Sequence, residues 1–259
     1  MPDRAHSSFF GELDQMKARL DAARPLPEET LASLRAHLAL EWTYHSNAIE
    51  GNTLTLRETQ VALEGITIGG KSLREHLEAI NHRDAIHYVE RLVSQQEILS
   101  ERAILEIHSL VLKGIYERQA GRYRQQNVVI TGASARPANF LHVRDEVGAL
   151  LDWHGSPQAR ALHLIEREAQ MHARFERIHP FIDGNGRTGR LLLNLELMKA
   201  GYPPTIIQKE DRLDYYQALD TASMTQDYMP ITCLVASAVK RSLELYLELL
   251  DSARADRNA

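Results

Sequence analysis

Apolar residues recur at steps of three and four along most of this chain, which is the spacing of a helix face rather than of a strand. A stripe that includes Trp42 and Ile49 predicts a helix over about residues 30–51, which ends at Gly51 because glycine commonly follows the last helical turn. The stretch Arg24-Pro-Leu-Pro27 separates this helix from an N-terminal helical segment. The pattern therefore predicts a mainly α protein.

Local signals mark where further helices begin. Thr55-x-x-Glu58 and Ser72-x-x-Glu75 are capping boxes, in which a hydroxyl and a carboxylate each accept a hydrogen bond from a free backbone N–H group. Ser100 is a predicted N-cap of another helix. Together with the apolar spacing, these signals predict short helices after Thr55 and Ser100 and longer ones over residues 72–93, 156–178, 188–199, 209–223 and 229–250.

One stretch has the composition of strands instead. Asn127–Thr131 and Asn139–Val143 are rich in strand-forming residues, and they flank the turn-rich segment Gly132–Ala138. A β-hairpin with a long tip is therefore predicted over about residues 127–143. The fold class predicted for the whole chain is a single, mainly α domain that carries this one hairpin.

The composition is that of an average globular protein and excludes several functional classes. Lys and Arg number 30 against 35 Asp and Glu, a formal charge of −5, which argues against bulk binding of nucleic acid. Cys233 is the single cysteine, so no intrachain disulfide can form. No apolar run approaches the roughly 18 residues of a membrane span, and the first residues lack the apolar core of a signal peptide. We therefore expect a cytoplasmic protein without a membrane or nucleic-acid partner.

The densest chemistry lies between two predicted helices, in the segment from His179 to Arg190. Gly184-Asn185-Gly186 precedes a predicted helix N-terminus, where converging N–H groups and the helix dipole attract an anion. Arg187 and Arg190 stand in or beside the first helical turn, where cations oppose that dipole. A phosphate that bridges the two guanidinium groups would remove the conflict, so the segment predicts a phosphate site.

Two further groups add reactivity to such a site. Asp183 supplies a hard oxygen ligand beside the glycines, which suits Mg²⁺ that bridges two phosphates. His179 is a candidate general base near neutral pH. A calcium-binding loop that begins at Asp183 is excluded, because Arg187 and Asn194 occupy two of its ligand positions. The residues together indicate a nucleotide site in which His179 deprotonates a nucleophile that attacks phosphorus.

The same segment matches the whole motif His-x-Phe-x-Asp/Glu-Gly-Asn-Gly-Arg-x-x-Arg, and on these residues the chain resembles the Fic family of protein adenylyltransferases over about residues 41–238. The resemblance implies a Fic-type helical core over residues 100–240. An N-terminal helical region over 1–99 precedes it, and a C-terminal helix end and tail follow over 241–259. It also implies transfer of AMP from ATP to a Ser, Thr or Tyr hydroxyl of a target protein, with release of pyrophosphate.

The resemblance also implies a role for each residue of the motif. His179 is implied as the base that activates the target hydroxyl, Phe181 as the anchor of the loop in the core, and Asp183 as the Mg²⁺ ligand. The remaining residues are implied to bind ATP: Gly184, Asn185 and Gly186 at the α- and β-phosphates, Arg187 along the phosphate chain, and Arg190 at the γ-phosphate.

A second motif lies upstream, where Ser46-Asn-Ala-Ile-Glu50-Gly51 resembles the inhibitory Ser/Thr-x-x-x-Glu-Gly/Asn motif of self-inhibited Fic proteins. Glu50 is predicted at the C-terminal end of its helix, the unfavourable end for a carboxylate, so it requires a cationic partner. By the resemblance that partner is Arg190, which would then lose its contact with the γ-phosphate. Ser46 lies one turn back on the same helix face and can support the carboxylate.

The predicted hairpin and a pair of tyrosines also acquire roles from the resemblance. In related proteins a hairpin beside the active site holds the target as an added strand, and the matching residues are Val128, Val129, Ile130 and Thr131. Tyr216 is positioned to stack on the base of the nucleotide. Two positions depart from the family pattern: Asn139-Phe140 stands where relatives often have Pro-Pro, and Ser223 where they often have Asn in the adenine pocket.

Three alternative functions remain open from the sequence. Glu50 serves some relatives as a base that aligns water, so the protein can be expected to remove AMP instead of, or as well as, adding it. A second alternative is transfer of phosphate or of another nucleotide. The third is a non-catalytic nucleotide-binding module, against which the intact His179 and Asp183 argue. A homodimer is a further expectation from the resemblance.

Overall fold

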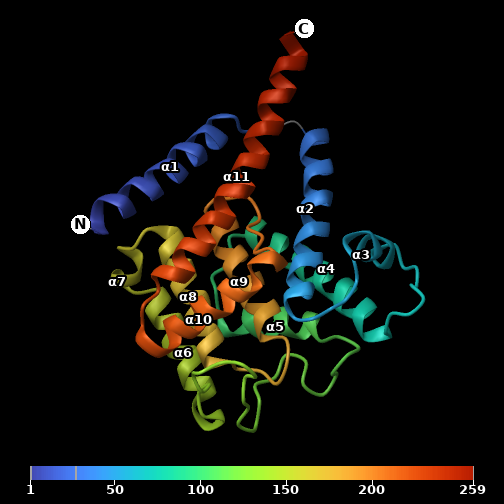
Figure 1. Ribbon diagram of the computed structural model, residues 1–259, viewed down its shortest axis with the longest axis vertical. Coiled ribbons are helices and arrows are strands. Elements are labelled where there is room, and N and C mark those ends of the chain that lie inside the picture. Colours follow the sequence, from blue (N-terminus) through green and yellow to red (C-terminus); the bar gives the residue numbers. More distant parts are fainter. Residues whose placement is uncertain (1, 27, 259) are drawn as a thin grey trace.

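The computed structural model describes residues 2–26 and 28–258, and in these residues every regular element is a helix (Figure 1). Pro27 of the predicted helix break, and residues 1 and 259 of the predicted ranges 1–99 and 241–259, lie outside the described residues. The elements are α1 (Pro2–Ala22), α2 (Glu28–Ile49), α3 (Leu56–Leu63), α4 (Leu73–Ser94), α5 (Glu101–Val111), η1 (Phe140–His142), α6 (Val143–His154), α7 (Pro157–Arg160), α8 (Leu164–Ile178), α9 (Asn185–Lys199), η2 (Lys209–Asp211), α10 (Arg212–Thr225) and α11 (Met229–Asn258).

The predicted capping boxes are both confirmed. The Thr55 hydroxyl accepts from the Glu58 N–H at 3.2 Å, and the Glu58 carboxylate accepts from the Thr55 N–H at 2.7 Å. The Ser72 hydroxyl and the Glu75 carboxylate make the same pair of bonds at 3.2 and 2.8 Å. These caps satisfy N–H groups that the first helical turn leaves free, and they fix where α3 and α4 begin.

Several of the predicted helices differ in extent from the structure. The last one, predicted over 229–250, continues as α11 to Asn258, and the one predicted over 209–223 begins as η2 and ends as α10 at Thr225. The helix predicted over 156–178 is divided into α7 and α8, because the chain leaves the helical conformation after Arg160 and the His163 ring caps a new helix by accepting from the Ile165 N–H at 3.3 Å. α9 begins at Asn185 rather than at residue 188, so the glycine-rich segment itself forms its first turn.

α9 is the central helix of the fold. It packs against α4, α5 and α8, and nearly all its side chains from Asn185 to Leu197 are buried. Its apolar residues belong to two core clusters: Leu193 belongs to the cluster that includes residues of α1, α10 and α11, and Leu191 to the cluster that includes residues of α4, α5 and α6. A helix that is buried all round holds its N-terminal turn rigidly, and that turn carries the predicted phosphate site.

The N-terminal helices lie on the outside of this core. α2 packs against α4 and reaches α9, while α1 packs against α11, which extends beyond the other helices at the top of Figure 1. None of the described helices is long and apolar enough to span a membrane. Because α2 contacts α9, the C-terminal end of α2 lies within reach of the first turns of α9.

The β-hairpin predicted over residues 127–143 is wrong. Residues 112–139 form no strand in the described chain, and η1 and the start of α6 occupy the predicted second strand. Side chains close this segment in place of a backbone ladder: Arg124 donates to the carbonyls of Gln126, at 2.9 Å, and of Ala138, and the Asn127 side chain accepts from the Phe140 N–H at 3.0 Å. A lone pair of strands has no sheet to stabilise it, so these bonds prevail. Residues 125–139 are called the flap loop below.

Candidate active site

His179 ends α8 and turns the chain into the loop that precedes α9. Its backbone is left-handed, with φ of +50°, a conformation that ends a helix and that few residues other than glycine adopt. The His179 N–H donates to the Phe175 carbonyl at 3.0 Å, and its own carbonyl accepts from Nε of Arg124 at 2.8 Å. Arg124 is buried, so one guanidinium group joins the flap loop to the backbone of the candidate base.

The imidazole of His179 is neutral at physiological pH. The pKa of His179 is lowered to about 4, chiefly by burial and also by the charge of Arg124, whereas the Glu176 carbonyl, Glu50 and Asp183 raise it too little to compensate. A neutral ring retains a lone pair that can accept a proton. The sequence-based role of a base is therefore compatible with the local electrostatics.

The loop between His179 and α9 is fixed from inside the core. Phe181 is fully buried and stacks on the ring of His108, with ring centroids 3.5 Å apart, so it anchors the loop as the resemblance implied. The side chain of Asn185 clamps the same residue: it accepts from the Phe181 N–H at 2.9 Å and donates to the Phe181 carbonyl at 3.0 Å. The Asn185 side chain is thereby committed to the loop, which leaves its backbone for contact with a phosphate.

Asp183 stands at the acidic end of the glycine-rich segment. Its Oδ1 accepts from the Gly184 N–H at 2.6 Å and from Nη2 of Arg187 at 3.1 Å, and its Oδ2 accepts from Nη2 of Arg74 at 2.6 Å. Burial alone would raise the pKa of Asp183, but the charges of Arg187 and Arg74 outweigh it and hold the pKa below its ordinary value. A single ionised carboxylate beside a phosphate site fits Mg²⁺, which takes few protein ligands and binds phosphate oxygens as well.

Gly184 and Arg187 support this carboxylate in different ways. Gly184 caps α9 with φ of +79°, and a Cβ there would lie 3.2 Å from Cγ1 of Val111, so the position requires glycine. Arg187 is buried, and its Nη1 lies 3.4 Å from Oε1 of Glu78. The sequence suggested that Arg187 runs along a phosphate chain, whereas in this structure its guanidinium lies between two carboxylates.

Arg190 stands at the basic end of the same segment and is buried. Its Nε donates to the Ser46 hydroxyl at 3.0 Å, and its Nη2 donates to the Ser46 carbonyl at 2.8 Å and to Oε1 of Glu50 at 2.7 Å. On the opposite side, its Nη1 donates to the Tyr215 hydroxyl at 3.4 Å. The two residues of the predicted inhibitory motif therefore both hold Arg190, although they lie more than 130 residues away in sequence.

Gly186 shows how closely Glu50 approaches the first turn of α9. A Cβ at this glycine would lie 2.1 Å from Oε1 of Glu50 and 3.0 Å from Nη1 of Arg190. The Glu50 carboxylate thus occupies the N-terminal end of a buried helix, where the dipole favours a negative group. It takes the position at which the sequence predicted a phosphate.

These groups open onto a cavity of about 600 Å³, a size typical of small-molecule sites. The flap loop forms one wall, through Ile130 and Thr131 among others, but Val128 and Val129 do not line it and Val129 is 92% exposed. Further lining side chains from the core and α10 are Glu50, Glu176, His179, Arg190, Arg212, Tyr215, Tyr216, Asp220 and Ser223. The predicted base, the predicted inhibitory residue and the predicted adenine-stacking tyrosine therefore share one cavity.

Several polar groups at this site had no signal in the sequence. Arg74 and Arg124 are single arginines outside any motif, and each contacts its partner in the loop from more than 50 residues away. Glu176 lines the cavity from within the core, and burial raises the pKa of its carboxyl to about 8. Contacts over such separations are set by how the elements pack, so a local sequence pattern does not contain them.

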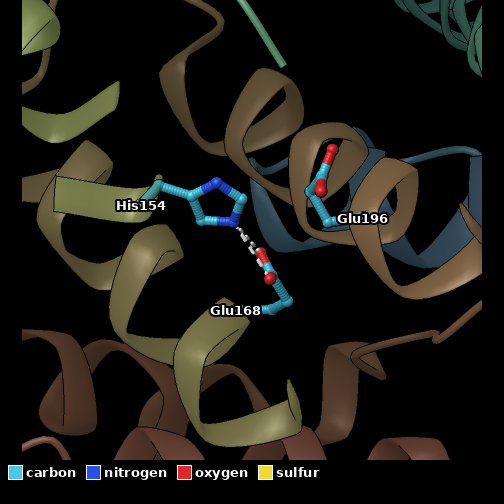
Figure 2. A group of neighbouring side chains, drawn as sticks. All are labelled: His154, Glu168 and Glu196. Carbon is cyan, nitrogen blue, oxygen red and sulfur yellow. Dashed lines mark hydrogen bonds and ion pairs between the residues drawn. The ribbon is translucent and has the colours of Figure 1, made fainter. Parts of the chain in front are cut away.

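A second group of titratable side chains lies apart from the cavity. Figure 2 shows His154, Glu168 and Glu196, whose possible ligand atoms all lie within 4.8 Å of one another. His154 Nε2 lies 3.0 Å from both oxygens of Glu168, Arg167 donates to Glu168 at 2.7 Å, and Lys199 donates to Glu196 at 2.8 Å. These bonds balance both carboxylates and account for the cluster as a contact between α6, α8 and α9.

Comparison with known proteins agrees with the geometry. Residues 98–197 match the Fic/DOC family. The chain is 38% identical over 239 residues to the protein adenylyltransferase Fic of Nematostella vectensis, covering 91% of this chain and 55% of the relative. It is 36% identical over 242 residues to the enzyme of the same name from Aedes aegypti, covering 92% and 47%. The chain thus spans about half the length of these curated relatives.

Solved structures extend the match to the fold. A segment of Fic-1 from C. elegans superposes with a TM-score of 0.88 at 31% identity, covering 97% of this chain and 74% of that one. A Fic domain containing signaling protein from Bacteroides thetaiotaomicron superposes with a TM-score of 0.84 at 30% identity, covering 93% and 97%. The mainly helical fold predicted from the sequence is confirmed by these relatives. The chain belongs to the Fic/DOC family.

Proposed function

We propose that this protein transfers AMP from ATP to a hydroxyl side chain of a target protein, and that Glu50 inhibits the transfer. The single observation that carries the proposal is the contact of Glu50 with both Arg190 and the first turn of α9, next to a neutral His179 in the same cavity. The relatives named protein adenylyltransferase support the choice of AMP as the transferred group.

In the proposed reaction His179 accepts the proton of the target hydroxyl. Its Nδ1 is buried, so Nε2 is the ring nitrogen left for the substrate. The hydroxyl oxygen forms a bond to the α-phosphorus as the bond from that phosphorus to the bridging oxygen of the β-phosphate breaks, and pyrophosphate leaves. Phosphoryl chemistry of this kind depends mainly on positioning and on stabilisation of charge, which the fixed loop and buried helix provide.

The phosphates of ATP occupy the first turn of α9 in this proposal. Backbone N–H groups of Gly184, Asn185 and Gly186 bind the α- and β-phosphates, and Arg190 binds the γ-phosphate once Glu50 has left. Asp183 would hold Mg²⁺, which neutralises phosphate charge when bound. Arg187 acts through Asp183, because its guanidinium lies 3.1 Å from that carboxylate.

The remaining walls of the cavity supply the base and target subsites. Tyr216 is 37% exposed and lines the cavity, so the exposed part of its ring is the surface that would contact a nucleotide base. The flap loop at Ile130 and Thr131 borders the same cavity, and an extended segment of the target would bind along it.

Paired labelling tests the proposal. Glu50→Gly protein is incubated with Mg²⁺, host lysate and either α-labelled or γ-labelled ATP, and the His179→Ala derivative of the same variant is the control. Label on protein from the α-position alone, absent from the control, supports adenylyl transfer at this site. Label from the γ-position alone means phosphorylation and overturns the proposal. Silence in both tubes also overturns it, and favours AMP removal, another nucleotide or a binding module.

A further inference from the structure

The carboxylate of Asp183 receives donors from two parts of the fold. Gly184 and Arg187 belong to the same loop and helix as Asp183, and both donate to Oδ1. Arg74 comes from the first turn of α4 and donates to Oδ2 at 2.6 Å. The oxygen that the loop itself leaves for a ligand is therefore taken by a cationic side chain from the N-terminal helices.

Arg74 has a second set of partners to which it can return. Its Nε donates to Glu78 at 2.9 Å, its Nη1 donates to the Tyr116 hydroxyl at 3.1 Å, and the guanidinium lies 5.2 Å from the centroid of the Tyr116 ring. The Arg74 side chain is 46% exposed. When Arg74 moves off Asp183 it loses that ion pair and keeps the ion pair with Glu78 and the hydrogen bond to Tyr116, and none of its charge becomes buried.

A divalent cation and this guanidinium compete for Oδ2. Mg²⁺ binds a carboxylate oxygen at about 2.0–2.1 Å with near-octahedral geometry, so a guanidinium on the same oxygen crowds the other ligands of the metal and sets two cations against each other. We propose that Arg74 competes with the metal for Asp183, so that loading of a metal–nucleotide complex must displace Arg74 onto Glu78 and Tyr116. The inference rests on the proposed function, in which Asp183 is the metal ligand.

The consequence is a second inhibitory contact, separate from Glu50. Glu50 blocks the basic end of the segment, and Arg74 blocks the acidic end. An exposed or half-exposed ion pair is typically worth up to about 1 kcal/mol, so removing Arg74 is expected to lower the Mg²⁺ requirement of nucleotide binding by up to about fivefold.

Calorimetric titration of ADP at a series of Mg²⁺ concentrations tests this. ADP is the probe because it carries the α- and β-phosphates but not the γ-phosphate assigned to Arg190, and Glu50 is present in every protein compared, so its effect is the same in all of them. Wild-type protein and Arg74→Gln are compared, and the expected result is half-maximal ADP binding at a lower Mg²⁺ concentration in the variant. Thermal melting of each protein without ligand checks that it is folded.

Arg102→Gln is the matched control. It removes the same charge and also an arginine–glutamate pair four residues apart on a helix, since Arg102 bonds Glu106 at 2.8 Å. An equal shift in both variants means a general charge effect and overturns the inference. A higher Mg²⁺ requirement in Arg74→Gln means that Arg74 orients Asp183 and also overturns it. If wild-type protein binds no ADP with Mg²⁺, the nucleotide site itself is overturned, and the inference with it.

Discussion

Arg190 and Asp183 lie at opposite ends of one short segment, and each is paired with a group from the N-terminal helices. The pair of Arg190 with Glu50 is the more buried one: the arginine side chain is 3% exposed and the glutamate 32%. The pair of Asp183 with Arg74 is more open, at 27% and 46%. Two ion pairs of similar length, 2.7 and 2.6 Å, therefore differ in what surrounds them.

The difference in burial decides what each pair can do. Removing one partner of a buried pair leaves a desolvated charge, which is strongly unfavourable, so Arg190 must exchange Glu50 for another anion such as a phosphate. The half-exposed pair at Asp183 breaks at small cost because water solvates both groups. At the basic end a ligand must therefore replace Glu50 on Arg190. At the acidic end a ligand can displace Arg74 from Asp183 at small cost.

The largest expected effect comes from removing Glu50, the partner of Arg190. Glu50→Gly frees Arg190 for the γ-phosphate, and a charge-assisted hydrogen bond of about 1.5–3 kcal/mol corresponds to a transfer rate about 10- to 100-fold higher. Glu50 lies beyond the last residue of α2, so glycine there does not interrupt the helix. The measurement is the initial rate of incorporation of α-label.

Glu64→Gly is the matched control for this variant, because Glu64 is an exposed glutamate at the C-cap of α3, another helix end. It is expected to leave the rate unchanged. Equal rates in wild-type protein and Glu50→Gly would show that the contact between Glu50 and Arg190 does not inhibit transfer.

The next effect concerns the glycines at the two ends. Ala at position 186 would put a Cβ 2.1 Å from Oε1 of Glu50, so Gly186→Ala is expected to lower the free energy of unfolding by about 1–3 kcal/mol. In a Glu50→Gly background the contact with the carboxylate is lost and only the 3.0 Å contact with Nη1 of Arg190 remains, so the cost of the alanine should be smaller. Urea denaturation of the four proteins in this double-mutant cycle measures the coupling.

Gly184→Ala, at the acidic end, is expected to behave differently from Gly186→Ala. Gly184→Ala is strained by its backbone, with φ of +79°, whatever Arg74 does. Its cost should therefore add to that of Arg74→Gln without coupling. An additive cycle at Gly186, or a coupled one at Gly184, would contradict the proposed difference between the two ends.

The sequence predicted local features better than their surroundings. The capping boxes are confirmed. The motif from His179 to Arg190 is also a local pattern, and the roles assigned to its residues stay predictions. The inhibitory pair was also predicted, because Ser46 and Glu50 form a motif of their own. Arg74 and Arg124 were missed, since each is a single arginine whose contacts depend on how α4 and the flap loop pack against the core.

The hairpin shows the converse error. Strand-forming residues over 127–131 and 139–143 gave a correct local preference and a wrong structure, because no neighbouring strand is available and Arg124 bonds both sides of the loop. Burial of α9 from its first turn likewise required the packed core, so the sequence placed its start at residue 188 instead of 185.

The half-exposed ion pair between Arg74 and Asp183 should contribute little to the free energy of unfolding. Arg74→Gln removes a half-exposed cation, so the free energy of unfolding is expected to fall by less than about 1 kcal/mol. Ser46→Ala at the other end removes the hydroxyl that accepts from Nε of Arg190 and leaves that buried donor unpaired, at a cost of about 1–3 kcal/mol. Urea denaturation compares the two. A larger loss for Arg74→Gln would mean that the contact at Asp183, and not the one at Arg190, contributes more to stability.

The smallest effect is expected from pH, which acts on His179. Glu50 and Asp183 both raise the pKa of His179, but burial dominates and lowers it to about 4. Because the folded pKa lies below the ordinary value, the ring stays neutral as pH falls through 6.5 and gains a proton only near pH 4. The transfer rate of Glu50→Gly should therefore be nearly constant between pH 8 and pH 6, whereas a histidine with an ordinary pKa near 6.5 would lose about fourfold. Initial rates across this range, at saturating ATP and Mg²⁺, decide between them. A fourfold fall would mean that loss of Glu50 exposes His179 to water, and that Glu50 at the basic end also keeps the base buried.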